Sequence, residues 1–214
     1  MGLNFSVKNI DEAFEKDKNK FSRFKGNPIL SPRPEFSFES KAVFNAATIY
    51  LDGKTHIVYR AMSDDNTSTL GYANTINGYT IDERLSYSIY TPREHFEQKV
   101  IPNGNSGCED PRITKIDNEL FMLYTAYRGD GPPKVAITSI QVNDFLNKKW
   151  NWKKSFLLSH PKIDDKNACI LPKKINNKYV IFHRTDKNIC VSYLDNLNLK
   201  ENKQFKCDII VLEP

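Results

Sequence analysis

The sequence lacks any long hydrophobic run, and this absence excludes the commonest membrane architecture. No apolar stretch among the 214 residues approaches the roughly 20 residues that a transmembrane helix needs. The N-terminal stretch MGLNFSVKNIDEAFEKDKNK also lacks the apolar core of a secretory signal. We therefore expect no membrane partner and a cytoplasmic location.

Cysteine is scarce, and its spacing excludes the common structural zinc sites. The four cysteines are Cys108, Cys169, Cys190 and Cys207, and no two of them form a C-x-x-C pair. Structural zinc sites use closely spaced Cys and His ligands. Cysteines of a protein without a secretory signal are normally reduced. The sequence therefore predicts four free thiols, no metal site and no cofactor.

Clustered positive charge is also absent. The chain has 31 Lys and Arg against 26 Asp and Glu, a net charge of +5, and acidic residues are mixed among the basic ones. Nucleic-acid-binding proteins gather basic residues on one face, so we expect no nucleic-acid partner. No Walker, dinucleotide or G-x-S-x-G motif is present. The mild positive bias would suit an anionic small substrate.

What the sequence does contain is one strand pattern, repeated three times. The copies lie at 44–61, 109–126 and 166–185. Each copy holds a short strand, a tight turn of Asp, Asn or Gly, and a second strand that ends near an aromatic residue or His. A third apolar segment follows each copy. Units of about four strands and about 60 residues are typical of β-propeller blades.

The repeats therefore predict an all-β fold, a β-propeller with about three blades. These would fill residues 26–214, with 208–214 starting a fourth blade; a β-sandwich with coincidental hairpins is the alternative. Propellers typically close with about 4–8 blades, so another copy or a second chain would have to complete the ring. Residues 1–25 have roughly helical apolar spacing, which predicts a short helix, with a disordered tail as the alternative.

An ordered set of short motifs carries a family resemblance. The motifs are NPIL (27–30), VFNAA (43–47), YRA (59–61), GCEDPRI (107–113), YTAY (124–127), DDKNA (164–168) and FHR (182–184). In this order they resemble the β-mannoside phosphorylases of glycoside hydrolase family 130. The resemblance covers roughly residues 26–200 and implies the N-terminal three-fifths of a five-bladed propeller, whose active site lies in the central channel. One departure is Ala46, where the family commonly has Pro.

The resemblance implies that Asp110 is the general acid. A carboxyl group fixed in a partly dry channel can hold its proton near neutral pH, as that role requires. Glu109 would strengthen this effect if both side chains faced the channel. Neighbours in a strand point to opposite faces, however, so a pair between Glu109 and Arg112 is also open. Without the resemblance, a solvated turn is the ordinary interpretation.

Sugar-binding positions are implied at Asn45 and Arg60. The chain's own spacing agrees for the first of them, because Asn45 precedes Tyr59 by 14 residues and Asp110 precedes Tyr124 by 14 residues. Equivalent positions in neighbouring blades should reach the same channel.

Phosphate is the remaining reactant, and it replaces the catalytic base of an inverting glycosidase because it is already a nucleophile. It needs cations to hold it. The resemblance implies such side chains at Arg128 and Lys166 first, then at His183 and Arg184. A solvated lysine and a buried histidine are the alternatives for Lys166 and His183.

The predicted function is therefore an inverting glycoside phosphorylase. Its partners would be a β-mannoside oligosaccharide and inorganic phosphate as co-substrate, and its product α-mannose 1-phosphate. Two alternatives remain from the sequence: an inverting β-mannosidase, and a truncated, non-catalytic propeller fragment.

Overall fold

The computed structural model describes residues 23–198, 204 and 206–213. Most of the helix predicted for 1–25 therefore lies outside the described residues. Within them, the two helices are short: η1 (Ser37–Glu39) and α2 (Val142–Leu146). Neither is long and apolar enough to cross a membrane. The remaining regular structure is β-strand, so the predicted all-β class is confirmed.

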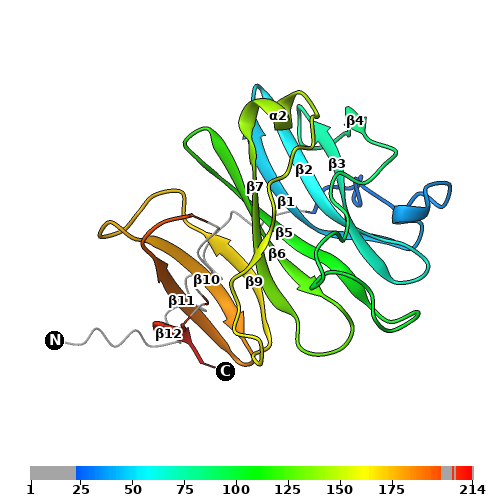
Figure 1. Ribbon diagram of the computed structural model, residues 1–214. Coiled ribbons are helices and arrows are strands. Elements are labelled where there is room, and N and C mark those ends of the chain that lie inside the picture. The colour runs from blue at the N-terminus through cyan, green and yellow to red at the C-terminus, as the bar shows by residue number, and fades with distance from the viewer. Residues whose placement is uncertain (1–22, 199–203, 205, 214) are drawn as a thin grey trace, which may run out of the picture.

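The strands form three antiparallel units in chain order (Figure 1). The first unit contains β1 (Ala42–Leu51), β2 (Lys54–Met62), β3 (Thr67–Thr75) and β4 (Glu83–Arg84). The second contains β5 (Ser106–Ile116), β6 (Glu119–Tyr127), β7 (Lys134–Gln141) and β8 (Phe156–Leu157). The third contains β9 (Asp165–Ile170), β10 (Tyr179–Thr185), β11 (Asn188–Leu194) and β12 (Ile209–Leu212).

Tight turns join the first two strands of each unit. Asp52 and Gly53 have φ of 47° and 74°, Asp117 has 53°, and Asn176 and Asn177 have 49° and 61°. These residue types adopt positive φ at low cost, which the right-handed twist of a hairpin favours. The turn prediction from the sequence is confirmed.

A short parallel contact joins the first two units into one eight-stranded sheet, while the third unit is a separate four-stranded sheet. In this contact β3 pairs with β5 through Thr67 with Ser106 and Ser68 with Gly107. Gly107 has φ 112°, and a Cβ there would lie 2.1 Å from the Ser68 carbonyl oxygen. Only glycine permits this approach. It places the start of β5 beside the first unit.

Strand β6 is buried on both faces, which ties the three units together. Leu120, Met122 and Tyr124 pack into the core shared with the first unit. The alternate residues Phe121 and Leu123 pack into a second core with side chains of the third unit. Since successive side chains of a strand point to opposite faces, one strand supplies both cores. Strand β6 thereby packs against the first unit on one face and against the third unit on the other.

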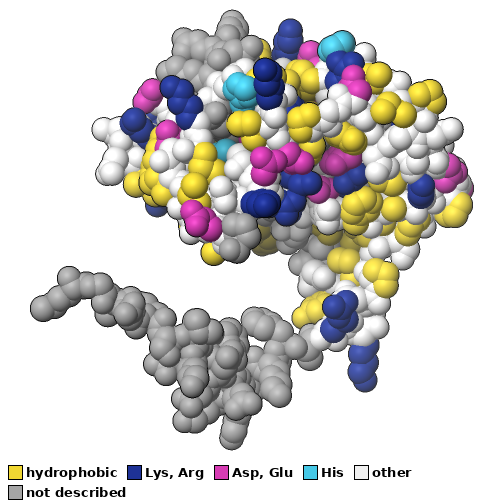
Figure 2. Space-filling view, turned by 90° about the horizontal axis from the view of Figure 1, so that it is seen from below, with side chains coloured by type: hydrophobic (Ala, Val, Ile, Leu, Met, Phe, Trp, Pro, Cys, Tyr) yellow, Lys and Arg dark blue, Asp and Glu magenta, His cyan; other side chains and the backbone are white. Residues whose placement is uncertain are grey.

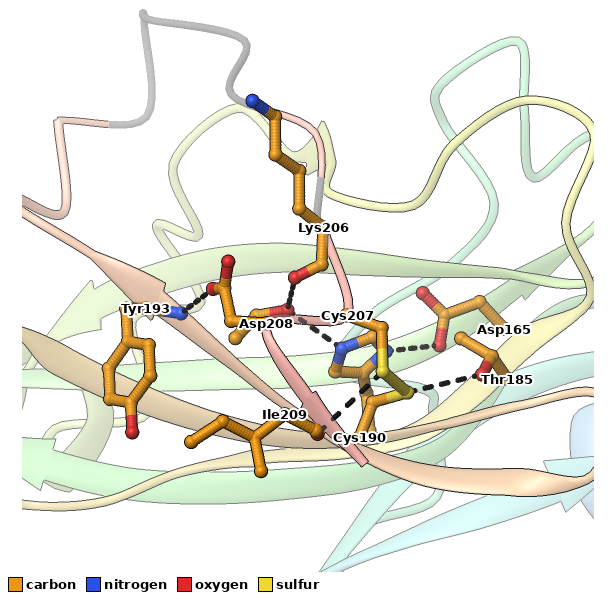
Figure 3. Close-up of a disulfide and its surroundings, with 10 residues drawn as sticks. Asp165, Thr185, Cys190, Tyr193, Lys206, Cys207, Asp208 and Ile209 are labelled. Carbon is orange, nitrogen blue, oxygen red and sulfur yellow. Dashed lines mark hydrogen bonds and ion pairs between the residues drawn. A yellow bond between two sulfur atoms is a disulfide. The ribbon is translucent and has the colours of Figure 1, made fainter. Parts of the chain in front are cut away.

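The last strand corrects two expectations. Cys190 and Cys207 form a disulfide (Figure 3), whereas Cys108 and Cys169 are free. The prediction of four reduced thiols is therefore wrong for this pair, and the cysteines no longer support a cytoplasmic location. Strand β12 pairs with β11, so the structure places it as the fourth strand of the third unit, whereas the sequence analysis assigned it to a fourth blade. Both features depend on the pairing of β12 with β11, which no local sequence motif predicts.

Candidate active site

The first strand of each unit carries one residue with left-handed backbone. These are Asn45, Asp110 and Asn167, with φ of 48°, 51° and 57°. The register with the second strand shifts near each of them. Asn and Asp adopt this conformation more readily than other non-glycine residues. The structure confirms that Asn45 and Asp110 hold equivalent places, and it adds a third.

Sequence reasoning missed Asn167 as a member of this set, although a signal was available. Each left-handed residue is followed by Ala or Pro, as in Asn45-Ala46, Asp110-Pro111 and Asn167-Ala168.

Arg60 of β2 joins the two acidic residues of β5. Its Nη2 donates to Glu109 Oε1 at 2.7 Å, and its Nη1 donates to Asp110 Oδ1 at 3.2 Å. Its Nε donates to Ser68 Oγ at 2.9 Å, and its guanidinium lies 4.7 Å from the centre of the Phe44 ring. The Arg60, Glu109 and Asp110 side chains are 9%, 13% and 16% exposed. The three side chains are therefore largely, but not completely, removed from solvent.

Glu109 and Asp110 share a partner because the bulge between them and Arg112 breaks the alternation of the strand. The alternative pair of Glu109 with Arg112 is wrong, since Arg112 Nη1 donates to the Pro111 carbonyl at 2.7 Å. Burial raises the pKa of the Glu109 carboxyl, an effect that Arg60 opposes and the Asp110 charge increases. The Glu109 carboxyl group therefore holds a proton more readily than a solvated carboxyl group does.

Two of the predicted phosphate-binding residues lie opposite each other in the third unit. Lys166 of β9 pairs in register with Arg184 of β10, just as Phe44 pairs with Arg60 in the first unit. Lys166 is also close enough to lower the pKa of Glu109. The fold therefore brings one cation of the third unit, Lys166, to the edge of the carboxylate cluster. On the face in Figure 2, acidic and basic side chains lie together near the middle.

His183 lies in the interior rather than beside these cations. It is 2% exposed, its Nδ1 lies 2.9 Å from Asp165 Oδ1, and its Nε2 lies 2.9 Å from Ser192 Oγ. It takes the place that Tyr59 and Tyr124 hold in the other units, one residue before the position of Arg60. The structure thus matches the interpretation of a buried histidine.

Arg128 lies at a different place on the surface. It lines a cleft of about 590 Å³ together with Lys134 and Lys154. Its Nη1 is 2.9 Å from the His95 ring, and its Nη2 donates to Asp130 Oδ2 at 3.2 Å. Among the described contacts, none joins Arg128 to the Asp110 cluster.

Asn45 is exposed and opens into a second cleft, of about 420 Å³. Apolar side chains that line this cleft include Ile29, Leu30 and Phe44. An apolar wall with polar side chains beside it, here Arg23, Asn27 and Asn45, fits the face of a pyranose ring. For metals, the described residues contain no group of three or more His, Cys, Asp or Glu side chains that could hold an ion.

Comparison with known proteins shows the family of this chain. Residues 18–206 match the family model described as β-1,4-mannooligosaccharide phosphorylase, Glyco_hydro_130. The chain belongs to glycoside hydrolase family 130. The resemblance drawn from the short motifs is confirmed.

Two curated members of the family come from Thermoanaerobacter sp. (strain X514). A β-1,2-mannobiose phosphorylase is 37% identical over 180 residues, which are 81% of this chain and 57% of that protein. A 1,2-β-oligomannan phosphorylase is 32% identical over 185 residues, 83% of this chain and 58% of that protein. The chain thus spans less than two thirds of the length of these family 130 relatives.

A solved family 130 structure shows the same fold. This structure was described with the finding that family 130, a family of mannoside phosphorylases, also contains glycoside hydrolases. Those hydrolases target β-1,2 mannosidic linkages in Candida mannan. It superposes with a TM-score of 0.71 at 22% identity, over 86% of this chain and 56% of that chain.

Proposed function

We propose that this chain is the N-terminal part of an inverting β-mannoside phosphorylase. Its three units would be three blades of a five-bladed propeller, with the first strands β1, β5 and β9 lining the channel. The observation that carries the proposal is the bridge from Arg60 to Glu109 and Asp110, with Lys166 beside it. A carboxylate pair next to cations is what an acid-catalysed attack by phosphate requires.

In this mechanism Asp110 donates a proton to the leaving oxygen, either directly or through a sugar hydroxyl. Phosphate attacks C1 from the opposite face, so the C1–O bond to the leaving sugar breaks as the C1–O bond to phosphate forms. The product is α-mannose 1-phosphate. No cofactor takes part, because phosphate is both nucleophile and co-substrate.

The surrounding residues would divide the remaining work. Lys166 and Arg184 would hold phosphate, since hydrogen bonds from cationic side chains to phosphate oxygens are charge-assisted and strong. Asn45 would bind the sugar. Arg60 would bind it too, and would keep the two carboxyl groups oriented. We leave His183 out of the phosphate set, because both ring nitrogens are engaged within the chain. Arg128 stays a candidate only if the complete protein moves it toward Asp110.

The linkage follows from the relatives rather than from the geometry. The family description names β-1,4-linked mannooligosaccharides, whereas the names of both curated relatives specify β-1,2 linkages. We therefore propose β-1,2-mannobiose as the first substrate to assay.

The test is to incubate the chain with β-1,2-mannobiose, with and without phosphate, and to measure mannose 1-phosphate and free mannose. We expect mannose 1-phosphate only when phosphate is present. Equal release of free mannose without phosphate would identify a hydrolase. If neither product forms, mannobiose binding should be measured with the Asn45→Ala variant as control. Asn45-dependent binding without turnover would identify a non-catalytic propeller fragment.

A further inference from the structure

The two sulfur atoms of the disulfide lie in different surroundings. Cys190 of β11 is fully buried, whereas Cys207, in the segment before β12, is exposed. Figure 3 shows Thr185 beside Cys190, and its Oγ1 lies 3.3 Å from Cys190 Sγ. A disulfide sulfur carries no hydrogen, so the Thr185 hydroxyl must be the donor. One sulfur is therefore open to attack, and the other can be stabilised as it leaves.

Without the disulfide, little holds the C-terminal segment 206–213 to the third unit. Strand β12 makes only three register pairs with β11, interrupted by an irregularity. Its four side chains, Ile209 to Leu212, are 49%, 48%, 53% and 60% exposed. The core cluster of this unit contains none of them. The segment buries too little apolar surface to hold itself in place.

Among the described residues, three further hydrogen bonds join this segment to β11. The Ser192 hydroxyl donates to the Lys206 carbonyl at 2.8 Å, and the Asp208 N–H donates to the Val191 carbonyl at 3.0 Å. The Tyr193 N–H donates to Asp208 Oδ2 at 2.9 Å. The bond from Ser192 is partly buried, whereas the bond between Tyr193 and Asp208 is exposed, so water competes for the latter.

We propose that the Cys190–Cys207 disulfide is a reducible lock, opened by dithiols through Cys207, that holds residues 206–213 on β11. One thiolate of the dithiol attacks Cys207 Sγ, the S–S bond breaks, and its electron pair goes to Cys190 Sγ, which then takes a proton from solvent. The second thiol attacks the mixed disulfide and releases Cys207 as a thiol. The dithiol leaves as a cyclic disulfide, so two electrons and two hydrogens move to the protein.

Opening the lock frees the segment but leaves the site strands in place. Strands β9 and β10 keep their own register pairs and their packing against the second unit. The His183 ring still bonds to Asp165 and Ser192. The change is therefore confined to the edge strand.

The first measurement counts thiols by alkylation of the denatured chain. We expect two alkylated cysteines, Cys108 and Cys169, without reductant, and four after dithiothreitol. The second measurement is amide hydrogen exchange with and without dithiothreitol. Exchange in 206–213 should rise at least about tenfold on reduction, as the entropy of an opened loop predicts. Exchange in β9 and β10 should change less than about twofold.

Matched variants separate the lock from other cysteine chemistry. Cys207→Ser should show fast exchange in 206–213 without reductant and no response to it. Cys169→Ser, which removes a free thiol, should keep the full response. Thr185→Val should slow reduction by about two- to tenfold, because the leaving thiolate loses a hydrogen bond.

Three results would overturn the proposal. Four alkylated cysteines without reductant would mean that the disulfide does not form. Unchanged exchange in 206–213 after full reduction would mean that the disulfide does not hold the segment. An equal rise in β9 and β10 would mean that it stabilises the whole unit instead of locking one strand. Equal reduction rates for Thr185→Val and the unmodified chain would remove Thr185 from the mechanism.

Discussion

The first and second units are built on the same frame but present different chemistry. In each, a left-handed residue interrupts the first strand, and a buried tyrosine follows 14 residues later. The residue is Asn45 in one unit and Asp110 in the other, so one side chain is an amide and the other a carboxyl group. The frame decides where the side chain is placed, and a single residue decides what it can do there.

The tyrosines differ in how their buried partners are held. Tyr59 donates to Glu39, which also receives Arg33 and Arg84. Tyr124 donates to Glu97. Within the described residues, Glu97 forms no ion pair with Lys or Arg. Neutral donors surround Glu97 instead: Tyr90, Ser155 and the N–H groups of residues 93 and 94. We call each buried pair of a tyrosine hydroxyl and a glutamate an anchor. The anchor of the first unit includes cations, and the anchor of the second unit consists of neutral donors.

The largest expected effect comes from making the two units alike at the left-handed residue. Asp110→Asn keeps a residue type that tolerates the conformation, so folding should be unchanged. Phosphorolysis should fall at least about a hundredfold, because general acid catalysis contributes about 10²–10⁴-fold. Formation of mannose 1-phosphate from a mannoside with a poor leaving group measures it. The control is Asn45→Asp in the same background, which should not restore activity. A variant that keeps most of its rate would remove Asp110 from the acid role.

A second comparison removes the tyrosine hydroxyl from each anchor. Tyr124→Phe should lower the free energy of unfolding by about 1–3 kcal/mol, because Glu97 loses a donor and pairs with no Lys or Arg in the described part of the chain. Tyr59→Phe should cost less, because Glu39 keeps two arginines. Denaturant unfolding of both variants gives the difference. Equal costs would show that cations and neutral donors hold these glutamates equally well.

The backbone conformation itself can be tested at Asn45, which is exposed. Asn45→Ala should destabilise the chain by about 1 kcal/mol, since alanine is strained in the left-handed region. Asn45→Gly removes the same side chain without that strain and should be closer to neutral. Thermal unfolding of the pair isolates the conformational cost. A glycine variant as unstable as the alanine variant would assign the cost to the lost amide.

The smallest effect concerns a position where the units differ in the core. His56 of β2 stands where the second unit has Phe121, and burial lowers the pKa of His56 from 6.5. Below about pH 6.5 His56 binds a proton in the unfolded chain more readily than in the folded chain. Protonation therefore favours the unfolded state, so the free energy of unfolding is highest above that pH and decreases as the pH falls. Denaturant midpoints between pH 7.5 and pH 5 measure it. His56→Phe introduces the residue of the second unit and should reduce the change of the denaturant midpoint between pH 7.5 and pH 5. An unchanged pH dependence would show that a group other than His56 titrates in this range.

The sequence alone predicted the features that depend on neighbouring residues. Alternating apolar residues and the Asp-Gly and Asn-Asn turns predicted the hairpins, and equal spacing to the tyrosines predicted that Asn45 and Asp110 correspond. These features follow from φ/ψ preferences and the two-residue period of a strand, which are local properties.

Only the tertiary structure decided which groups meet. The parallel contact at Gly107 brings Arg60 to Glu109 in place of Arg112, and the bulge turns both carboxyl groups to the same guanidinium. The pairing of β12 with β11 joins Cys190 to Cys207, and the register of β10 turns His183 inward while Arg184 faces Lys166. Each of these contacts depends on the register between strands distant in the chain, where a shift of one residue reverses every side chain, so no local pattern could have specified them.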